Sequence, residues 1–90
     1  MQIGILESKD FSQKALDKLS NIGNIELFDS KDLNSFLLEK EILYIRLEYF
    51  INEDFMNKAK KLKYICTPTT GLNHIDLDEC KKRDIKIISL

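Results

Sequence analysis

The stretch that decides the fold reads CTPTTGLNHID at residues 66–76. It begins at the end of an apolar segment and continues through a threonine-rich turn that contains one glycine. It ends at Asp76, and aspartate is a residue type favoured at the N-cap, the position just before a helix. A strand, a tight turn and a helix in this order are typical of an α/β domain, and such a turn presents main-chain N–H groups to an anion. The stretch therefore predicts both a fold class and a candidate binding position.

Five short apolar segments, rich in β-branched and aromatic residues, predict five strands. They are residues 3–6, 25–28, 42–45, 64–67 and 85–89. Continuous apolar runs of this length are typical of parallel strands that are buried on both faces of the sheet. We therefore expect all five strands to be covered on both sides.

Four helical segments alternate with these strands. The first is expected to begin at Ser12 and to carry an apolar stripe as far as Ile22, with Gly23 as a left-handed stop. The second is expected over residues 31–39, with Ser30 as its N-cap.

The third and fourth helices have clearer start signals. The third follows Asn52 and is expected to end near Lys61. The fourth follows Asp76, which with Glu79 predicts an aspartate version of the capping box.

The alternation predicts one α/β domain over residues 1–90, with a flavodoxin-like, doubly wound sheet of five parallel strands in the order 2-1-3-4-5. In this order the first helix covers one face and the next three cover the other. A fifth helix, missing from this sequence, normally joins the first. We therefore expect an uncovered apolar face near the fourth and fifth strands, which indicates either a piece of a larger protein or association, such as a homodimer.

Composition excludes several partners. A net charge of -1 gives no electrostatic reason to expect nucleic acid or an anionic membrane. No apolar run approaches the roughly 18–20 residues of a membrane span. The two cysteines, Cys66 and Cys80, are too few for a disulfide framework, so we expect a cytoplasmic protein.

Three predicted loops meet at the carboxyl ends of the strands, where open parallel sheets bind ligands. They cover residues 7–10, the segment that begins at Arg46, and the turn that contains Thr70 and Gly71. An arginine fork and main-chain donors suit a small carboxylate. The structural alternative for Arg46 is an ion pair with one of three glutamates, Glu7, Glu48 and Glu53.

His74 is the only histidine of the chain. A catalytic base needs a nearby substrate and usually a carboxylate partner, and Asp76 is better used as a helix cap. We therefore favour a structural histidine at the entry of the helix. A zinc site of His74 with Cys66 and Cys80 matches no usual ligand spacing, and both cysteines are typical small buried residues.

The second half of the chain resembles the D-isomer-specific 2-hydroxyacid dehydrogenases, the family that includes D-3-phosphoglycerate dehydrogenase. Residues 42–46 (ILYIR) are similar to the family's strand that ends in arginine, and residues 62–65 (LKYI) to its L-K-x-I strand. Residues 70–76 (TGLNHID) resemble its G-x-G-x-D-N-I-D turn, and residues 83–87 (RDIKI) its R-G-I-x-V segment. The first half of the chain matches only in layout.

The resemblance implies an NAD-dependent oxidoreductase that interconverts a D-2-hydroxy acid and its 2-keto acid. It implies that the substrate carboxylate is held by main-chain N–H groups of Thr70, Gly71 and Leu72, with help from Arg46. It also implies that NAD binds a separate Rossmann domain and that the catalytic residues belong to later sequence, so this substrate-binding portion is expected to be inactive alone. The chain contains no G-x-G-x-x-G, and Asp84 stands where the family usually has glycine.

Two interpretations stay open. The first is the substrate-binding portion of a dehydrogenase, and the second is a free-standing flavodoxin-like binding or regulatory module that pairs with a partner through its open sheet face. A phospho-receiver domain shares the strand order, but it requires an aspartate where this chain has Arg46.

Overall fold

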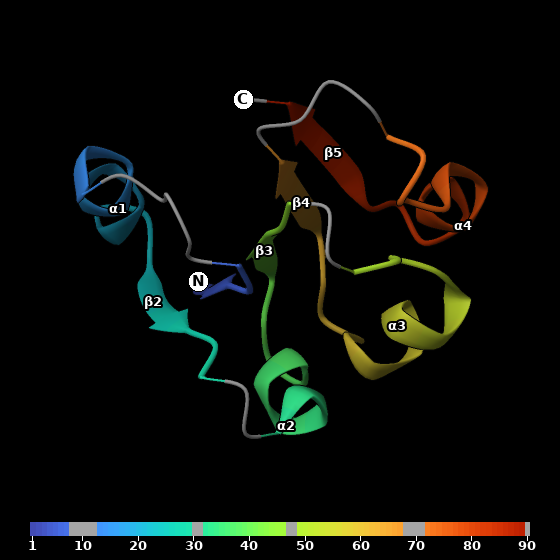
Figure 1. Ribbon diagram of the computed structural model, residues 1–90, viewed down its shortest axis with the longest axis horizontal. Coiled ribbons are helices and arrows are strands. Elements are labelled where there is room, and N and C mark those ends of the chain that lie inside the picture. The colour runs from blue at the N-terminus through green and yellow to red at the C-terminus, as the bar shows by residue number, and fades with distance from the viewer. Residues whose placement is uncertain (8–12, 30–31, 47–48, 68–71, 90) are drawn as a thin grey trace.

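The computed structural model describes residues 1–7, 13–29, 32–46, 49–67 and 72–89, and in these residues five strands alternate with four helices (Figure 1). The strands are β1 (Gln2–Ile5), β2 (Asn24–Leu27), β3 (Ile42–Tyr44), β4 (Tyr64–Thr67) and β5 (Lys86–Ser89). The helices are α1 (Gln13–Ser20), α2 (Leu33–Leu37), α3 (Glu53–Lys58) and α4 (Leu77–Lys82). All strand pairs are parallel in the order β2-β1-β3-β4-β5, which confirms the predicted arrangement. None of the described helices is both long and apolar enough to cross a membrane.

The two faces of the sheet carry separate apolar clusters. Leu43 in β3 belongs to the larger cluster, which includes buried side chains of α2, α3 and α4. Its neighbours Ile42 and Tyr44 point to the opposite face and join a smaller cluster, against which Leu19 of α1 packs. Figure 1 shows α1 set apart from the other three helices, across the central strands. One helix on one face and three on the other is the predicted distribution.

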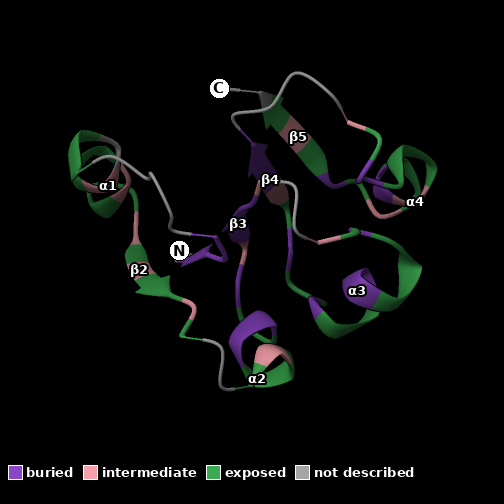
Figure 2. Ribbon diagram, viewed as in Figure 1, coloured by how far each residue is buried: buried purple, intermediate pink, exposed green. Residues whose placement is uncertain are grey.

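Burial is concentrated in the central strands β1, β3 and β4 (Figure 2). The prediction that all five strands are buried on both faces is wrong for β2 and β5, because these strands form the two edges of the sheet. Leu27 in β2 is 50% exposed and Ile88 in β5 is 40% exposed. Ile88 pairs opposite Cys66, so it lies on the α1 side, where we expected an uncovered face; Cys66 itself is buried.

The third and fourth helices begin where the sequence predicted. The Asn52 side chain accepts the N–H of Phe55 at 3.0 Å, and the Asp76 carboxylate accepts the N–H of Glu79 at 3.0 Å. The second arm of the predicted capping box is not formed. The main-chain N–H of Asp76 donates instead to the carbonyl of Ile51 at 2.9 Å, which ties the start of α4 to the loop before α3.

Two helices are shorter than predicted. The N-cap of α2 is Asp32, whose carboxylate accepts two main-chain N–H groups of the first turn. Ser30, the predicted cap, and Ser12, the predicted start of α1, lie outside the described residues. The helix α3 ends at Lys58 rather than near Lys61.

The end of α4 explains how an aspartate replaces the glycine of the family pattern. Asp84 has a φ of 57°, in the left-handed region that aspartate tolerates better than most residues. Its N–H donates to the carbonyl of Lys81 at 3.2 Å, and the N–H of Ile85 donates to the carbonyl of Cys80 at 2.8 Å. These two bonds form a Schellman motif, and buried Ile85 and Cys80 belong to the same apolar cluster.

Gly23 is not the left-handed stop that the sequence predicted, since no described glycine has a positive φ. The position needs glycine because the chain passes close to the N-terminus. A Cβ atom on Gly23 would overlap the carbonyl oxygen of Met1, which accepts the N–H of Asn24 at 2.9 Å. Ile22, predicted to belong to the apolar stripe of α1, lies beyond the end of that helix and is 57% exposed.

We expect Gly23→Ala to lower the free energy of unfolding by about 1–3 kcal/mol, because the added methyl group forces β2 away from Met1. Urea denaturation of the chain measures the change. Asn21→Ala is the matched control, since Asn21 is exposed and lies two residues earlier. Equal stability of Gly23→Ala and the parent chain would contradict the close approach.

Glu41, at the amino ends of the strands, makes a pH-dependent contribution to the stability of the fold. The N–H of Gln2 donates to its carboxylate at 3.1 Å and lowers its pKa below the ordinary value of 4.5, and Lys63 at 3.5 Å acts in the same direction. A depressed folded-state pKa stabilises the fold at higher pH, and this contribution is lost as the pH falls through that pKa. We therefore expect Glu41→Gln to destabilise the chain at pH 7 and to differ less from the parent chain at pH 3, measured by urea denaturation. A difference that is independent of pH would contradict this assignment.

Candidate functional site

The parallel hydrogen-bond ladder continues beyond the ends of β1 and β3. The N–H of Leu6 donates to the carbonyl of Tyr44 at 3.0 Å, and the N–H of Ile45 donates to the carbonyl of Cys66 at 2.9 Å. Neighbouring parallel strands therefore end at one edge of the sheet, which is the edge where such sheets bind ligands. Described polar residues at this edge include Glu7 after β1, Arg46 after β3 and Thr67 at the end of β4.

Glu7 fixes the main chain where it leaves β3. The side chain is only 7% exposed, and its carboxylate accepts the main-chain N–H of Arg46. A buried carboxylate requires such donors, because an unpaired charge in the interior is costly. The contact sets the path of the chain at Arg46, whose side chain is half-buried. The sequence placed Glu7 in a loop at this edge and suggested it as an ion-pair partner of the Arg46 side chain, and that ion pair stays a prediction.

Tyr44 lies beneath this edge, in the smaller apolar cluster. Burial raises the pKa of the Tyr44 hydroxyl; the charge of Arg46 lowers it, while Glu7 and Cys66 raise it further. The hydroxyl therefore stays protonated at neutral pH.

The four predicted substrate-binding residues are described only in part. Arg46 lies at the carboxyl edge, whereas Thr70 and Gly71 lie outside the described residues. Leu72 packs its side chain against the larger apolar cluster, and its carbonyl accepts the N–H of Ile75 at 3.0 Å. Leu72 thus anchors the end of the turn, and the carboxylate contact of its own N–H stays a prediction.

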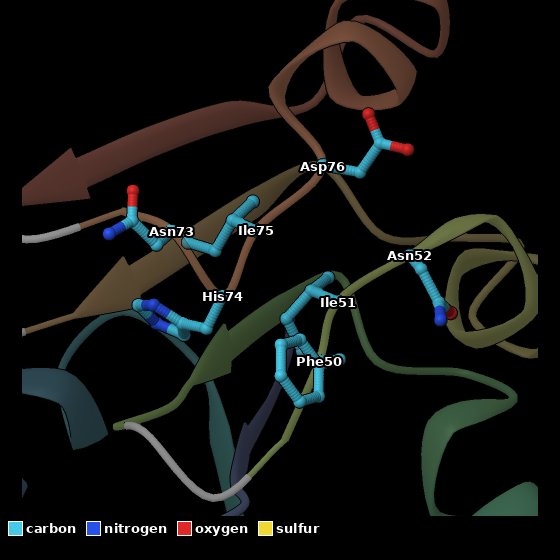
Figure 3. A pocket seen from close by; sticks show the side chains of 7 residues that line it. All are labelled: Phe50, Ile51, Asn52, Asn73, His74, Ile75 and Asp76. Carbon is cyan, nitrogen blue, oxygen red and sulfur yellow. The ribbon is translucent and has the colours of Figure 1, made fainter.

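A cavity of about 200 Å³ lies between the loop before α3 and the loop before α4 (Figure 3). Its lining comes from two short segments, Phe50 to Asn52 and Asn73 to Asp76. Figure 3 shows Asn73 and His74 on the side of the arrowheads of β3 and β4, and the side chains of Asn52 and Asp76 directed toward the helices that they cap. His74 is buried, in agreement with the position at the helix entry that we expected, but no sequence pattern predicted the cavity.

The two cysteines lie on opposite faces of the sheet. Cys66 belongs to the cluster beneath α1 and Cys80 to the cluster beneath the other helices. Burial raises the pKa of both thiols, and the carboxylates of Asp76 and Glu79 raise that of Cys80 further. They therefore fill apolar space as neutral thiols, and the described geometry does not bring them together around one ion.

Most of the chain is similar in sequence to known proteins of one family. The catalytic domain of the D-isomer specific 2-hydroxyacid dehydrogenases matches residues 4–90. The chain is 28% identical over 76 residues to erythronate-4-phosphate dehydrogenase of Pseudoalteromonas atlantica, covering 83% of this chain and 20% of that protein. It is 32% identical over 83 residues to D-3-phosphoglycerate dehydrogenase of Escherichia coli, covering 86% of this chain and 20% of that protein. The chain thus spans about a fifth of the length of these curated relatives.

Solved structures agree on the fold. A protein of Pyrococcus horikoshii superposes with a TM-score of 0.86 at 22% identity, over 99% of this chain and 27% of its own. D-lactate dehydrogenase of Aquifex aeolicus, solved with NAD and lactic acid, superposes with a TM-score of 0.78 at 22% identity, over 100% of this chain and 28% of its own. The match of the family's catalytic domain over residues 4–90 shows that the chain belongs to the D-isomer specific 2-hydroxyacid dehydrogenase family.

Proposed function

We propose that this chain is the N-terminal part of the substrate-binding domain of an NAD-dependent oxidoreductase that interconverts a D-2-hydroxy acid and its 2-keto acid. The observation that carries the proposal is the position of Arg46 at the carboxyl edge, with its main chain held by buried Glu7. Family membership supports the reaction class, and the lactic acid bound to the Aquifex aeolicus enzyme supports a small acid as the substrate.

The chemistry of the edge suits a carboxylate. A guanidinium is planar and always charged, and it can donate two parallel hydrogen bonds to the two carboxylate oxygens. In the proposed site, Arg46 donates these two hydrogen bonds to the substrate carboxylate. The main-chain N–H groups of Thr70, Gly71 and Leu72 donate further hydrogen bonds to it. A carboxylate held at both oxygens can rotate little, so C2 of the acid is presented in one orientation. The proposed task of this chain is to bind and orient the acid.

Among the described residues, the starts of α3 and α4 do not suit a dinucleotide. Its pyrophosphate requires free N–H groups at a helix N-terminus, reached through a glycine-rich turn. Side chains of Asn52 and Asp76 occupy first-turn N–H groups of α3 and α4, and the Asp76 carboxylate repels phosphate. We therefore place NAD on a separate Rossmann domain outside this chain, and we expect the chain alone to be inactive.

The second candidate function is a binding module that forms a homodimer, or pairs with a partner, through the α1 side of β4 and β5. The 40% exposure of Ile88 on that side favours it. Either function is compatible with the reducing cytoplasm that we propose as the location, since Cys66 and Cys80 lie on opposite faces as neutral thiols.

In the complete dehydrogenase, Arg46→Gln is expected to raise KM for the 2-keto acid by roughly 10- to 150-fold, because a charge-assisted hydrogen bond contributes about 1.5–3 kcal/mol. A smaller change in kcat is expected, since the carboxylate is held alike in the ground and transition states. Steady-state kinetics measure both. Lys63→Gln is the control, because it removes one positive charge at the opposite end of the sheet. An unchanged KM in Arg46→Gln would leave Arg46 with a structural role only.

NADH should not bind the 90-residue chain. In α3 and α4 the side chains of Asn52 and Asp76 already accept a first-turn N–H, and the sequence has no G-x-G-x-x-G turn to receive the pyrophosphate. A fluorescence titration of the chain with NADH measures this directly. Saturable micromolar binding would overturn the assignment of the cofactor to another domain.

A further inference from the structure

Glu7 and Arg46 lie opposite each other where two neighbouring strands end. In the parallel register of β1 and β3, Ile5 pairs with Tyr44. Two positions further along each segment, the same register brings Glu7 opposite Arg46, and the hydrogen bond between them agrees with this. The arginine proposed to bind the acid therefore has a buried carboxylate as its neighbour on the next segment.

A side chain takes over from the main chain at this point. Among the described residues, the main-chain ladder between β1 and β3 ends with the bond from the Leu6 N–H to the Tyr44 carbonyl at 3.0 Å. The next N–H on this side of β3 belongs to Arg46, and the Glu7 carboxylate accepts it. The backbone position of Arg46 thus depends on the identity of one side chain, which a substitution can change.

The charges of both residues act on one buried hydroxyl. Burial raises the pKa of Tyr44, the charge of Arg46 lowers that pKa, and the charge of Glu7 raises it. Tyr44 belongs to the smaller apolar cluster, on the α1 side of the sheet. Glu7 and Arg46 are therefore close to each other through their charged groups as well as through the main chain.

The backbone position of Arg46 matters for a bound acid. Two parallel hydrogen bonds to a carboxylate require the guanidinium plane to be aligned with both oxygens. The Arg46 side chain is half-buried, so its neighbours limit how far its torsions can correct a displaced backbone. A small misplacement of a group that orients the substrate is enough to weaken binding and turnover.

We propose that Glu7 is a positioning residue for the substrate acid: it holds the backbone of Arg46 so that the guanidinium meets the carboxylate, and it does not touch the acid itself. The inference rests on the proposed function, because it adds a second residue to the carboxylate site of that function. It also makes a specific claim. The length of the Glu7 side chain, which lets an oxygen reach the Arg46 N–H, matters more than its charge.

Two conservative substitutions separate length from charge. Glu7→Gln keeps the length and a carbonyl oxygen that can accept the Arg46 N–H, but it removes the charge. Glu7→Asp keeps the charge and shortens the side chain by one methylene group. Glu39→Asp makes the same exchange at an exposed position and is the matched control.

Steady-state kinetics of the complete dehydrogenase with pyruvate, glyoxylate and hydroxypyruvate measure the effect. We expect Glu7→Asp to raise KM for the 2-keto acid about threefold to tenfold, as for the loss of one hydrogen bond, and Glu7→Gln to stay within about twofold of the parent enzyme. The KM for NADH should stay unchanged in both variants, whereas a general loss of structure would alter it too. If Glu7→Asp does not fold, Glu7→Met takes its place, because it has the length of glutamine without the acceptor.

A double-mutant cycle shows whether Glu7 acts through Arg46. Arg46→Gln removes the guanidinium, so Glu7→Asp should raise KM no further in the Arg46→Gln background. The NMR spectrum of the 90-residue chain gives an independent measurement. The Arg46 amide proton should move upfield in Glu7→Asp, which loses the hydrogen bond, and stay near its parent position in Glu7→Gln.

The outcomes separate the two proposals. If Arg46→Gln raises KM and Glu7→Asp does not, the positioning role is overturned and the proposed function stands. Additive effects in the cycle, an unmoved Arg46 amide in Glu7→Asp, or a larger effect of Glu7→Gln than of Glu7→Asp would each overturn it as well. If the enzyme reduces none of the three acids, or if Arg46→Gln leaves KM unchanged, the proposed carboxylate site fails, and the role of Glu7 fails with it.

Discussion

The parallel hydrogen bonds that join β1, β3 and β4 continue past the strands, and the candidate site depends on this continuation. The bonds from Leu6 to Tyr44 and from Ile45 to Cys66 carry three chain segments to the same edge before any of them turns away. The buried carboxylate of Glu7 then takes the next N–H, that of Arg46, which the ladder would otherwise leave unpaired. The position of the arginine thus follows from main-chain bonding.

The elements set by local chemistry could be predicted from the sequence. Asn52 and Asp76 cap α3 and α4 as expected, because a side-chain oxygen three residues before a free N–H needs no tertiary contact to bind it. The strand order also follows from sequence, since five short apolar runs joined by helical crossovers leave few right-handed parallel arrangements. The position of Arg46 at the carboxyl edge of the sheet follows from the same topology.

The features that the sequence could not show depend on contacts between distant segments. Gly23 is required by the carbonyl of Met1, which no local pattern reveals. Leu27 has the same residue type as a buried strand position, yet it lies at a sheet edge and is half exposed. The cavity at His74 exists because the loop at Ile51 pairs with the loop at Ile75, more than twenty positions later. The spacing of apolar residues along the sequence does not predict that pairing.

The carboxyl edge at Arg46 and the cavity beside His74 differ in the charge that they offer. Arg46 offers a permanent positive charge at the carboxyl edge, whereas the cavity at His74 is bordered by the acidic first turns of two helices. Those acidic residues favour the helix N-termini, so the same charges that stabilise α3 and α4 also make the cavity unfavourable for anions. An anion is therefore attracted to the carboxyl edge at Arg46 and repelled at the cavity beside His74.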